Sequence, residues 1–135
     1  MKLDNETISF LTFFERLTHA RIKDCFFEKE RLVFVVEPGE MSKAIGKQGS
    51  NVKRMELMSK KKIKIVEFNP EVKNFIRNYL MPLQTQEITE KDNIIFIKMN
   101  GMREKGLLIG RDKANIEHLK EIVKKYFVVE DIKVM

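Results

Sequence analysis

Two glycines three residues apart, with a lysine between them, form the pattern in this chain best suited to binding an anion. The segment is Gly46-Lys47-Gln48-Gly49, and it separates two stretches with helical periodicity. Such glycines let the backbone turn sharply and let a partner approach without a Cβ atom in the way. Amide groups at the start of the following helix favour an anion, and Lys47 adds a positive charge. The spacing therefore predicts a phosphate-binding loop, with Ser50 as the N-cap of that helix.

Apolar side chains near this loop predict a groove beside it. Ile45, Val52 and the edge of a strand over 63–66 would form its walls. Phosphates on the loop and bases in the groove would suit single-stranded nucleic acid. The alternative is a tight turn between two helices, since many such turns contain glycine. The residues that we expect to contact nucleic acid here are Ile45, Gly46, Lys47, Gln48, Gly49, Ser50, Asn51 and Lys53.

Positive charge is concentrated around the same segment. The 135-residue chain has 26 Lys and Arg against 20 Asp and Glu, a net charge of +6 and a pI near 9.4. Residues 41–64 contain eight of the basic residues and a single acidic residue, Glu56. Such a segment attracts phosphate at long range. A solvated helix face, whose lysine stems cover apolar surface, is the alternative.

Residues suited to catalysis or metal binding are few. The single cysteine, Cys25, and the two histidines, His19 and His118, lie far apart in sequence and do not form a metal-ligand pattern. Residues 101–106 have the glycine spacing of a P-loop, but Leu107 stands where its lysine is required. We therefore expect no enzyme activity, cofactor, metal or small-molecule substrate, and Cys25 to behave as a small apolar residue. A catalytic site assembled by folding would leave no such spacing and stays an alternative.

The composition also bears on compartment. With 43% hydrophobic and 34% charged residues, the chain is typical of a soluble globular protein. No apolar run approaches the roughly 20 residues of a membrane span, and the first ten residues, MKLDNETISF, lack the apolar core of a secretory signal. We therefore expect a cytoplasmic protein with no membrane partner.

The elements that position the loop occur twice, because the chain contains one sequence pattern in two copies. The opening segment and the first strands repeat at a shift of 62 residues, the loop at 64 and the last strand at 69. The matched segments are 10–17 with 72–79, 32–35 with 94–97, 45–47 with 109–111, and 63–66 with 132–135.

Hydrophobic periodicity predicts the same order of elements in each copy, α-β-β-α-α-β. Phe10, Phe13, Phe14 and Leu17 have the spacing of one apolar helix face. Two short β-rich runs around a charged turn follow, then a short helix, the glycine break, a longer helix and a last strand. The expected strands are 22–27, 32–37, 63–66, 84–89, 94–99 and 132–135, and the expected short helices are 41–45 and 103–109. This order predicts an α+β fold, with helices on one face of a three-stranded sheet, repeated across a boundary near 67–70.

This unit resembles a type II KH domain, the RNA-binding module with a GXXG loop. The run VEPGEMSKAIGKQGSNVKRME, residues 36–56, is similar to the first KH domain of the NusA-like transcription factors in their short archaeal-type form. The resemblance implies two tandem type II KH domains, over 1–67 and 70–135. It also implies cytosolic binding of single-stranded RNA, an RNA polymerase partner and a role in transcription termination or antitermination. A KH protein of the ribosome or its assembly, or a KH fold used for protein contacts, is the alternative.

The second loop departs from the motif. In Gly110-Arg111-Asp112-Lys113, Lys113 replaces the closing glycine and Asp112 adds a negative charge, while Ala114 replaces the serine. A left-handed backbone at Lys113 would be strained. Gly110, Arg111, Asp112 and Lys113 are nevertheless included among the expected RNA contacts, because the loop keeps two cations. The alternative is a second copy that serves only for packing.

Overall fold

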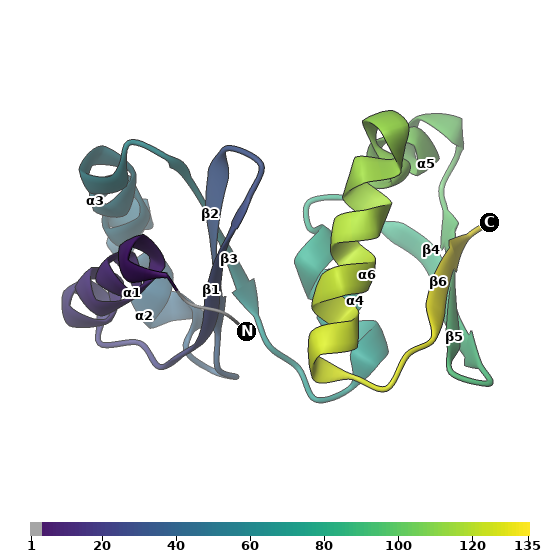
Figure 1. Cartoon of the computed structure of the whole chain (residues 1–135), viewed down its shortest axis with the longest axis horizontal. Coiled ribbons are helices and arrows are strands. Elements are labelled where there is room, and N and C mark those ends of the chain that lie inside the picture. The colour runs from purple at the N-terminus through teal and green to yellow at the C-terminus, as the bar shows by residue number, and fades with distance from the viewer. Residues whose placement is uncertain (1–3) are drawn as a thin grey trace. The chain divides into compact units, whose positions relative to one another are not determined.

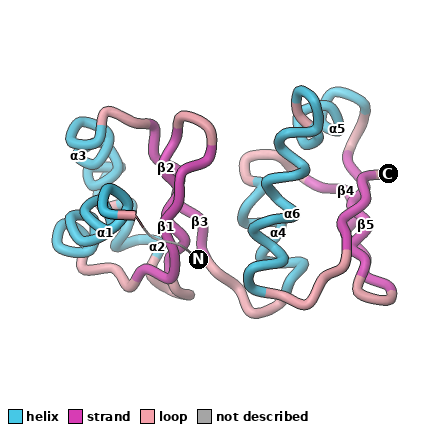
Figure 2. Tube along the Cα trace, viewed as in Figure 1, coloured by secondary structure: helices cyan, strands magenta, loops and turns pink. Residues whose placement is uncertain are grey.

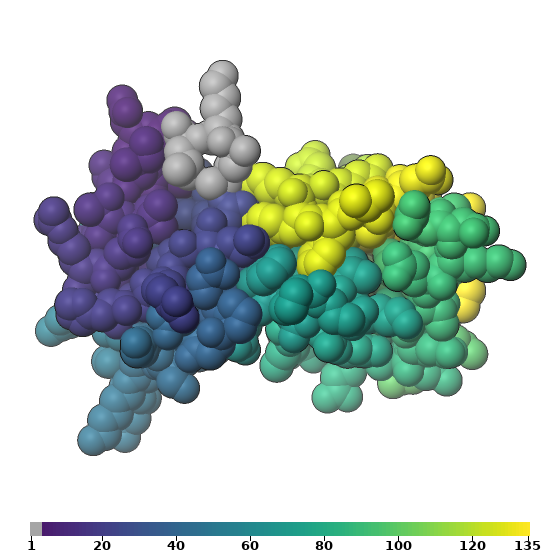
Figure 3. Space-filling model, turned by 90° about the horizontal axis from the view of Figure 1, so that it is seen from below, coloured from purple at the N-terminus to yellow at the C-terminus, as the bar shows by residue number. Residues whose placement is uncertain are grey.

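The protein folds as two compact units, the first ending at Asn69 and the second beginning at Pro70. The computed structural model describes residues 4–135, which Figure 1 shows as a ribbon and Figure 3 as a space-filling surface. Each unit is α+β and contains one three-stranded sheet. The expected fold class is thereby confirmed at this level.

The first unit places three helices on one face of its sheet (Figure 2). In the sheet, β2 lies between β1 and β3, antiparallel to the first and parallel to the second. Leu32, Phe34 and Val36 alternate along β2 and pack against buried side chains of all three helices. The elements are α1 (Asn5–Thr18), β1 (Ile22–Glu28), β2 (Arg31–Val36), α2 (Met41–Ile45), η1 (Lys47–Gly49), α3 (Ser50–Ser59) and β3 (Lys62–Glu67), where η1 is a single 3-10 turn.

The second unit repeats this order and this strand pairing. Its middle strand, β5, is antiparallel to β4 and parallel to β6. The predicted helix face Val72, Phe75, Ile76, Tyr79 and Leu80 is buried, as expected. The elements are α4 (Val72–Leu80), β4 (Thr85–Lys91), β5 (Ile94–Met99), α5 (Met102–Ile109), η2 (Arg111–Lys113), α6 (Ala114–Tyr126) and β6 (Asp131–Val134).

The strand pairing corrects the predicted repeat by one residue. Cys25 pairs with Phe34, and Ile88 pairs with Ile97, so the two hairpins correspond at a shift of 63 rather than 62. A shift of 62 would match the fully buried Phe34 with Phe96, which is only half-buried. Side chains alternate between the faces of a strand, so a slip of one residue exchanges the core face for the other face.

The face of α1 also differs from its prediction. Phe14 is fully buried and its ring stacks on that of Phe34 at 4.1 Å between centroids, but the Phe13 side chain is 39% exposed. The buried face is centred on Thr7, Phe14 and Thr18. Thr18 can occupy it because its hydroxyl donates a hydrogen bond to the Phe14 carbonyl at 2.8 Å, which satisfies the polar group locally.

Candidate nucleic-acid interface

The first loop depends on the backbone of Gly46. This residue has φ 78° and ψ 170°, a region adopted almost only by glycine. A Cβ atom at this position would lie 2.8 Å from the side chain of Asn51 and 2.9 Å from the Ser50 hydroxyl oxygen. Both the torsion angles and the space therefore require glycine here.

Asn51 holds the loop in shape. Its side-chain amide donates a hydrogen bond to the Lys43 carbonyl at 2.9 Å, which ties the start of α3 back to α2. The Gly46 N–H bonds the Ser42 carbonyl, and the Gly49 N–H bonds the Gly46 carbonyl. The side chain of Asn51, an expected RNA contact, thus also braces the loop.

Ser50 is not the N-cap of α3, contrary to the prediction. It has helical torsion angles, φ −60° and ψ −38°, and its N–H bonds the Lys47 carbonyl within the 3-10 turn. The N-cap is Gly49, in the left-handed conformation and without a side-chain cap bond. The turn η1 therefore begins the helical path earlier than the glycine pattern indicates. Ser50 lies instead at the rim of the loop.

The predicted contact residues at the loop tip are accessible. Lys47 and Gln48 are exposed, as is Lys53 one turn into α3. Gln48 takes a left-handed backbone, φ 56° and ψ 30°, which keeps the turn tight. The loop therefore presents one cation at its tip and a second beside it.

A groove of about 400 Å³ lies next to this loop, between α3 and β3. The structure places the predicted walls Ile45, Val52 and Ile63 in it. Sequence reasoning missed Met41 and Glu56, although each lies four residues along a helix from a predicted wall. The full lining is Met41, Ile45, Gly49, Val52, Lys53, Glu56, Ile63 and Ile65.

The second loop follows the same backbone path despite its different sequence. Gly110 has φ 77° and ψ 172°, and Asp112 and Lys113 are both left-handed. Asn115 donates to the Leu107 carbonyl at 2.9 Å, as Asn51 does to Lys43 in the first unit. Lys113 thus adopts the strained conformation, at a cost of about 1 kcal/mol relative to glycine. Arg111, Asp112 and Lys113 are all exposed.

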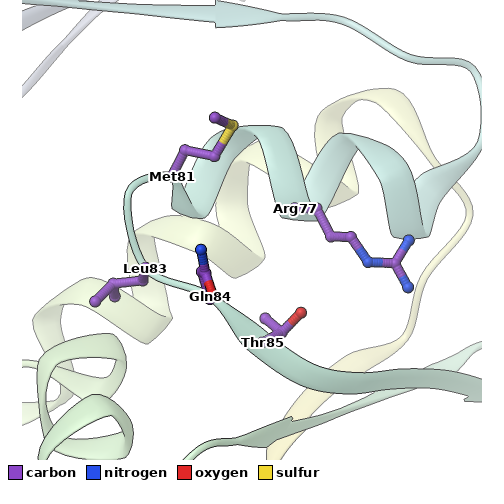
Figure 4. A pocket seen from close by; sticks show the side chains of 5 residues that line it. All are labelled: Arg77, Met81, Leu83, Gln84 and Thr85. Carbon is purple, nitrogen blue, oxygen red and sulfur yellow. The ribbon is translucent and has the colours of Figure 1, made fainter.

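A different hollow, of about 240 Å³, lies in the second unit. Figure 4 shows Arg77 and Met81 at α4, Leu83 and Gln84 on the segment that leads into β4, and Thr85 at the start of that strand. One guanidinium nitrogen of Arg77 donates to the Asn74 side chain at 3.0 Å. None of the predicted contact residues lines this hollow.

Across residues 4–135, no three His, Cys, Asp or Glu side chains gather closely enough to hold a metal ion. None of the helices in that part of the chain combines the length and hydropathy that a membrane-spanning helix needs. Cys25 is buried, as expected of a small apolar residue, and burial raises the pKa of its thiol to about 12.

Comparison with known proteins gives a consistent family. A KH domain model matches residues 11–80. Proteins named "Probable transcription termination protein NusA" are similar over nearly the whole chain. The relative from Methanocaldococcus jannaschii is 34% identical and covers 100% of this chain and 75% of its own length. The relative from Halobacterium salinarum is 34% identical, covering 98% and 96%.

A solved structure extends the similarity to the fold. The crystal structure of APE1850 has a TM-score of 0.73 at 23% identity, and the match covers 98% of this chain and 100% of that one. At this level of identity the similarity concerns the fold alone.

Proposed function

Because the chain belongs to the family of NusA-like KH-domain proteins, we propose that it is an RNA-binding transcription termination factor with no catalytic activity of its own. The observation that carries this proposal is the exposed Gly46–Gly49 loop beside an apolar groove. We propose that the two units are type II KH domains, over 1–67 and 70–135. The site of action would be the cytoplasm, with single-stranded RNA as ligand.

Phosphates would bind at the loop and bases in the groove. Lys47 and Lys53 are exposed cations on the loop and the next helical turn, so they can neutralise phosphates. Val52 and Ile63, on facing walls, offer apolar surface to unstacked bases. The first glycine keeps side-chain atoms away from the approaching backbone. In the second unit, Gly110, Arg111, Asp112 and Lys113 would form the corresponding loop contact.

The decisive experiment changes the tip of the first loop. The Lys47→Asp/Gln48→Asp double variant should lose at least tenfold in affinity for a short single-stranded RNA pool, because it turns a phosphate contact into a repulsive one. Fluorescence anisotropy with labelled RNA measures this. The matched control is Lys91→Asp/Asn93→Asp, which makes the same charge change at the end of β4 and in the turn that follows it.

Melting curves establish that both variants fold, as exposed loop changes usually permit. Equal affinities for the two double variants would overturn the loop assignment. Failure of the unaltered protein to bind any RNA would overturn RNA binding itself.

RNA polymerase is the proposed protein partner, by family membership. Affinity purification of the tagged chain from its native cells should recover polymerase subunits. These subunits should still be recovered when the extract has been treated with nuclease. Recovery of ribosomal particles without polymerase would instead support a KH protein of the ribosome.

A further inference from the structure

The two units differ in the charged residues at and beside the groove, which form its rim. In the first unit, Lys53 and Glu56 on α3 line the groove, and Lys62 at the start of β3 precedes its lining residue Ile63. The equivalent residues of the second unit are Glu117, Lys120 and Asp131. The strand equivalence is structural, because Lys62 and Asp131 each open their strand and pair with the first residue of the preceding one. Two cations and an anion are thus replaced by two anions and a cation.

The single cation in the second unit is held by both anions. The Lys120 ammonium lies 3.0 Å from an Asp131 carboxylate oxygen and 3.4 Å from one of Glu117. The Asp131 contact joins α6 to β6 across the position of the groove. In the first unit, Glu56 instead accepts a long hydrogen bond, 3.4 Å, from the Ile63 backbone N–H.

The apolar walls differ in the same direction. Val52 and Ile63 are half-buried and line the open groove of the first unit. Their counterparts Ile116 and Ile132 are 6% and 2% exposed. These two apolar wall positions are therefore covered in the second unit, whereas Ile109 and Val134, the counterparts of Ile45 and Ile65, stay half-buried as those are.

Opening this second groove to RNA would be electrostatically unfavourable. A base could enter only if Lys120 left its two carboxylates, and Glu117 and Asp131 would then lie beside the phosphate chain. Asp112 adds a further negative charge at the loop tip. Like charges at this range repel the RNA backbone. Arg111 and Lys113 stay exposed on the loop and can still meet a phosphate.

We propose that the Lys120–Asp131 bridge and the anionic rim close the second groove to bases. Only the first unit then binds bases. The second unit contacts RNA through phosphates alone, by means of Arg111 and Lys113. The inference rests on the proposed RNA-binding function and adds a division of labour between two units with the same loop geometry.

Photo-crosslinking of the full chain tests this directly. RNA containing 4-thiouridine is crosslinked to the unaltered protein and the attached peptides are identified by mass spectrometry. Crosslinks should fall within residues 41–65 and be missing from 116–134. Crosslinks of similar yield in both segments would overturn the inference and leave the proposed function standing. If no RNA binds at all, the proposed function fails first.

A second experiment uses a variant designed to open the groove of the second unit. In the Lys47→Asp/Gln48→Asp background, we add Glu117→Ala/Asp131→Ala, which removes both rim anions and the bridge. The control adds Glu87→Ala/Glu90→Ala, the same charge change on β4 at the opposite edge of the sheet. The rim variant should gain crosslinks within 116–134. It should also bind RNA at least about threefold more tightly than the control. A folded rim variant that gains neither would contradict the closure.

Discussion

At the scale of single residues, glycine is required at the first position of each loop, Gly46 and Gly110. It is not required at Gly106, four residues before the second loop. A Cβ atom at Gly110 would lie 2.6 Å from the Asn115 side chain, whereas one at Gly106, in α5, would have no neighbour within 4 Å. Gly110→Ala should therefore lower the free energy of unfolding by about 2 kcal/mol. Gly106→Ala, the matched control, should raise it by up to about 1 kcal/mol, because alanine favours the helix. Urea denaturation measures both, and a neutral Gly110→Ala would mean that the loop can follow another path.

At Lys113 the opposite substitution, to glycine, can be tested, because this lysine adopts a backbone conformation that favours glycine. With φ 64° it occupies the position of Gly49, whose φ is 74°. Lys113→Gly should raise the free energy of unfolding by about 1 kcal/mol. The same change removes an exposed cation from the loop and should weaken RNA binding. Stability and affinity moving in opposite directions would indicate that Lys113 is kept for its charge, and unchanged affinity would contradict a phosphate contact here.

At the scale of elements, the bridge between α6 and β6 predicts a pH dependence. The hydrogen bond from Lys120 lowers the pKa of Asp131 below its ordinary value of 3.8, and Lys124 adds to the effect. Asp131 therefore binds its proton less readily in the folded chain. Its contribution to stability is present above pH 3.8 and is lost as the pH falls through the lower folded value. The advantage of the unaltered protein over Asp131→Asn in unfolding free energy should narrow as the pH falls below about 4. A constant difference across this range would contradict the ion pair.

The elements themselves are largely predictable from the sequence, because hydrophobic periodicity reports local structure. The helix over 41–45 and the strand over 94–99 have the predicted bounds. What periodicity misses depends on contacts made elsewhere. Phe13 has the spacing of a core residue, but its side chain is exposed. Thr18 is polar, yet it is buried because its hydroxyl donates a hydrogen bond within the helix. Ser50 has the pattern of a cap, but a 3-10 turn places it inside the helix.

The site was predictable in outline for the same reason. The glycine spacing indicates the loop, and the apolar residues Ile45 and Val52 beside it indicate two of the groove walls. The bracing role of Asn51 depends on its bond to Lys43, eight residues away, which no local pattern reports. The bridge from Lys120 to Asp131 likewise joins a helix to a strand, and it becomes visible only once both are folded.

At the scale of the whole molecule, duplication has kept the backbone and changed the charges. The torsion angles of the two loops agree to within 10°, although only two of six residues from Ile45 to Ser50 are identical in the second copy. The basic segment 41–64 carries more positive charge than the chain as a whole, so the remainder is slightly acidic. Long-range attraction of RNA therefore favours the first unit, because the positive charge of segment 41–64 surrounds the loop there.

This asymmetry predicts how salt affects RNA binding by the intact chain. A KH loop and groove accommodate about four nucleotides, and each neutralised phosphate of single-stranded RNA contributes about −0.7 to the slope of log affinity against log salt. Affinity should then fall at least about 50-fold between roughly 50 and 200 mM salt, and phosphates bound by Arg111 or Lys113 add to this fall. Arg111→Ala/Lys113→Ala should reduce the slope and weaken all RNA sequences equally, because phosphates carry no sequence information. Lys53→Glu, which gives the first groove the rim charge of the second, should reduce the slope and also the preference among sequences. Anisotropy titrations at several salt concentrations measure both, and a flat salt response of the unaltered protein would contradict phosphate binding at either loop.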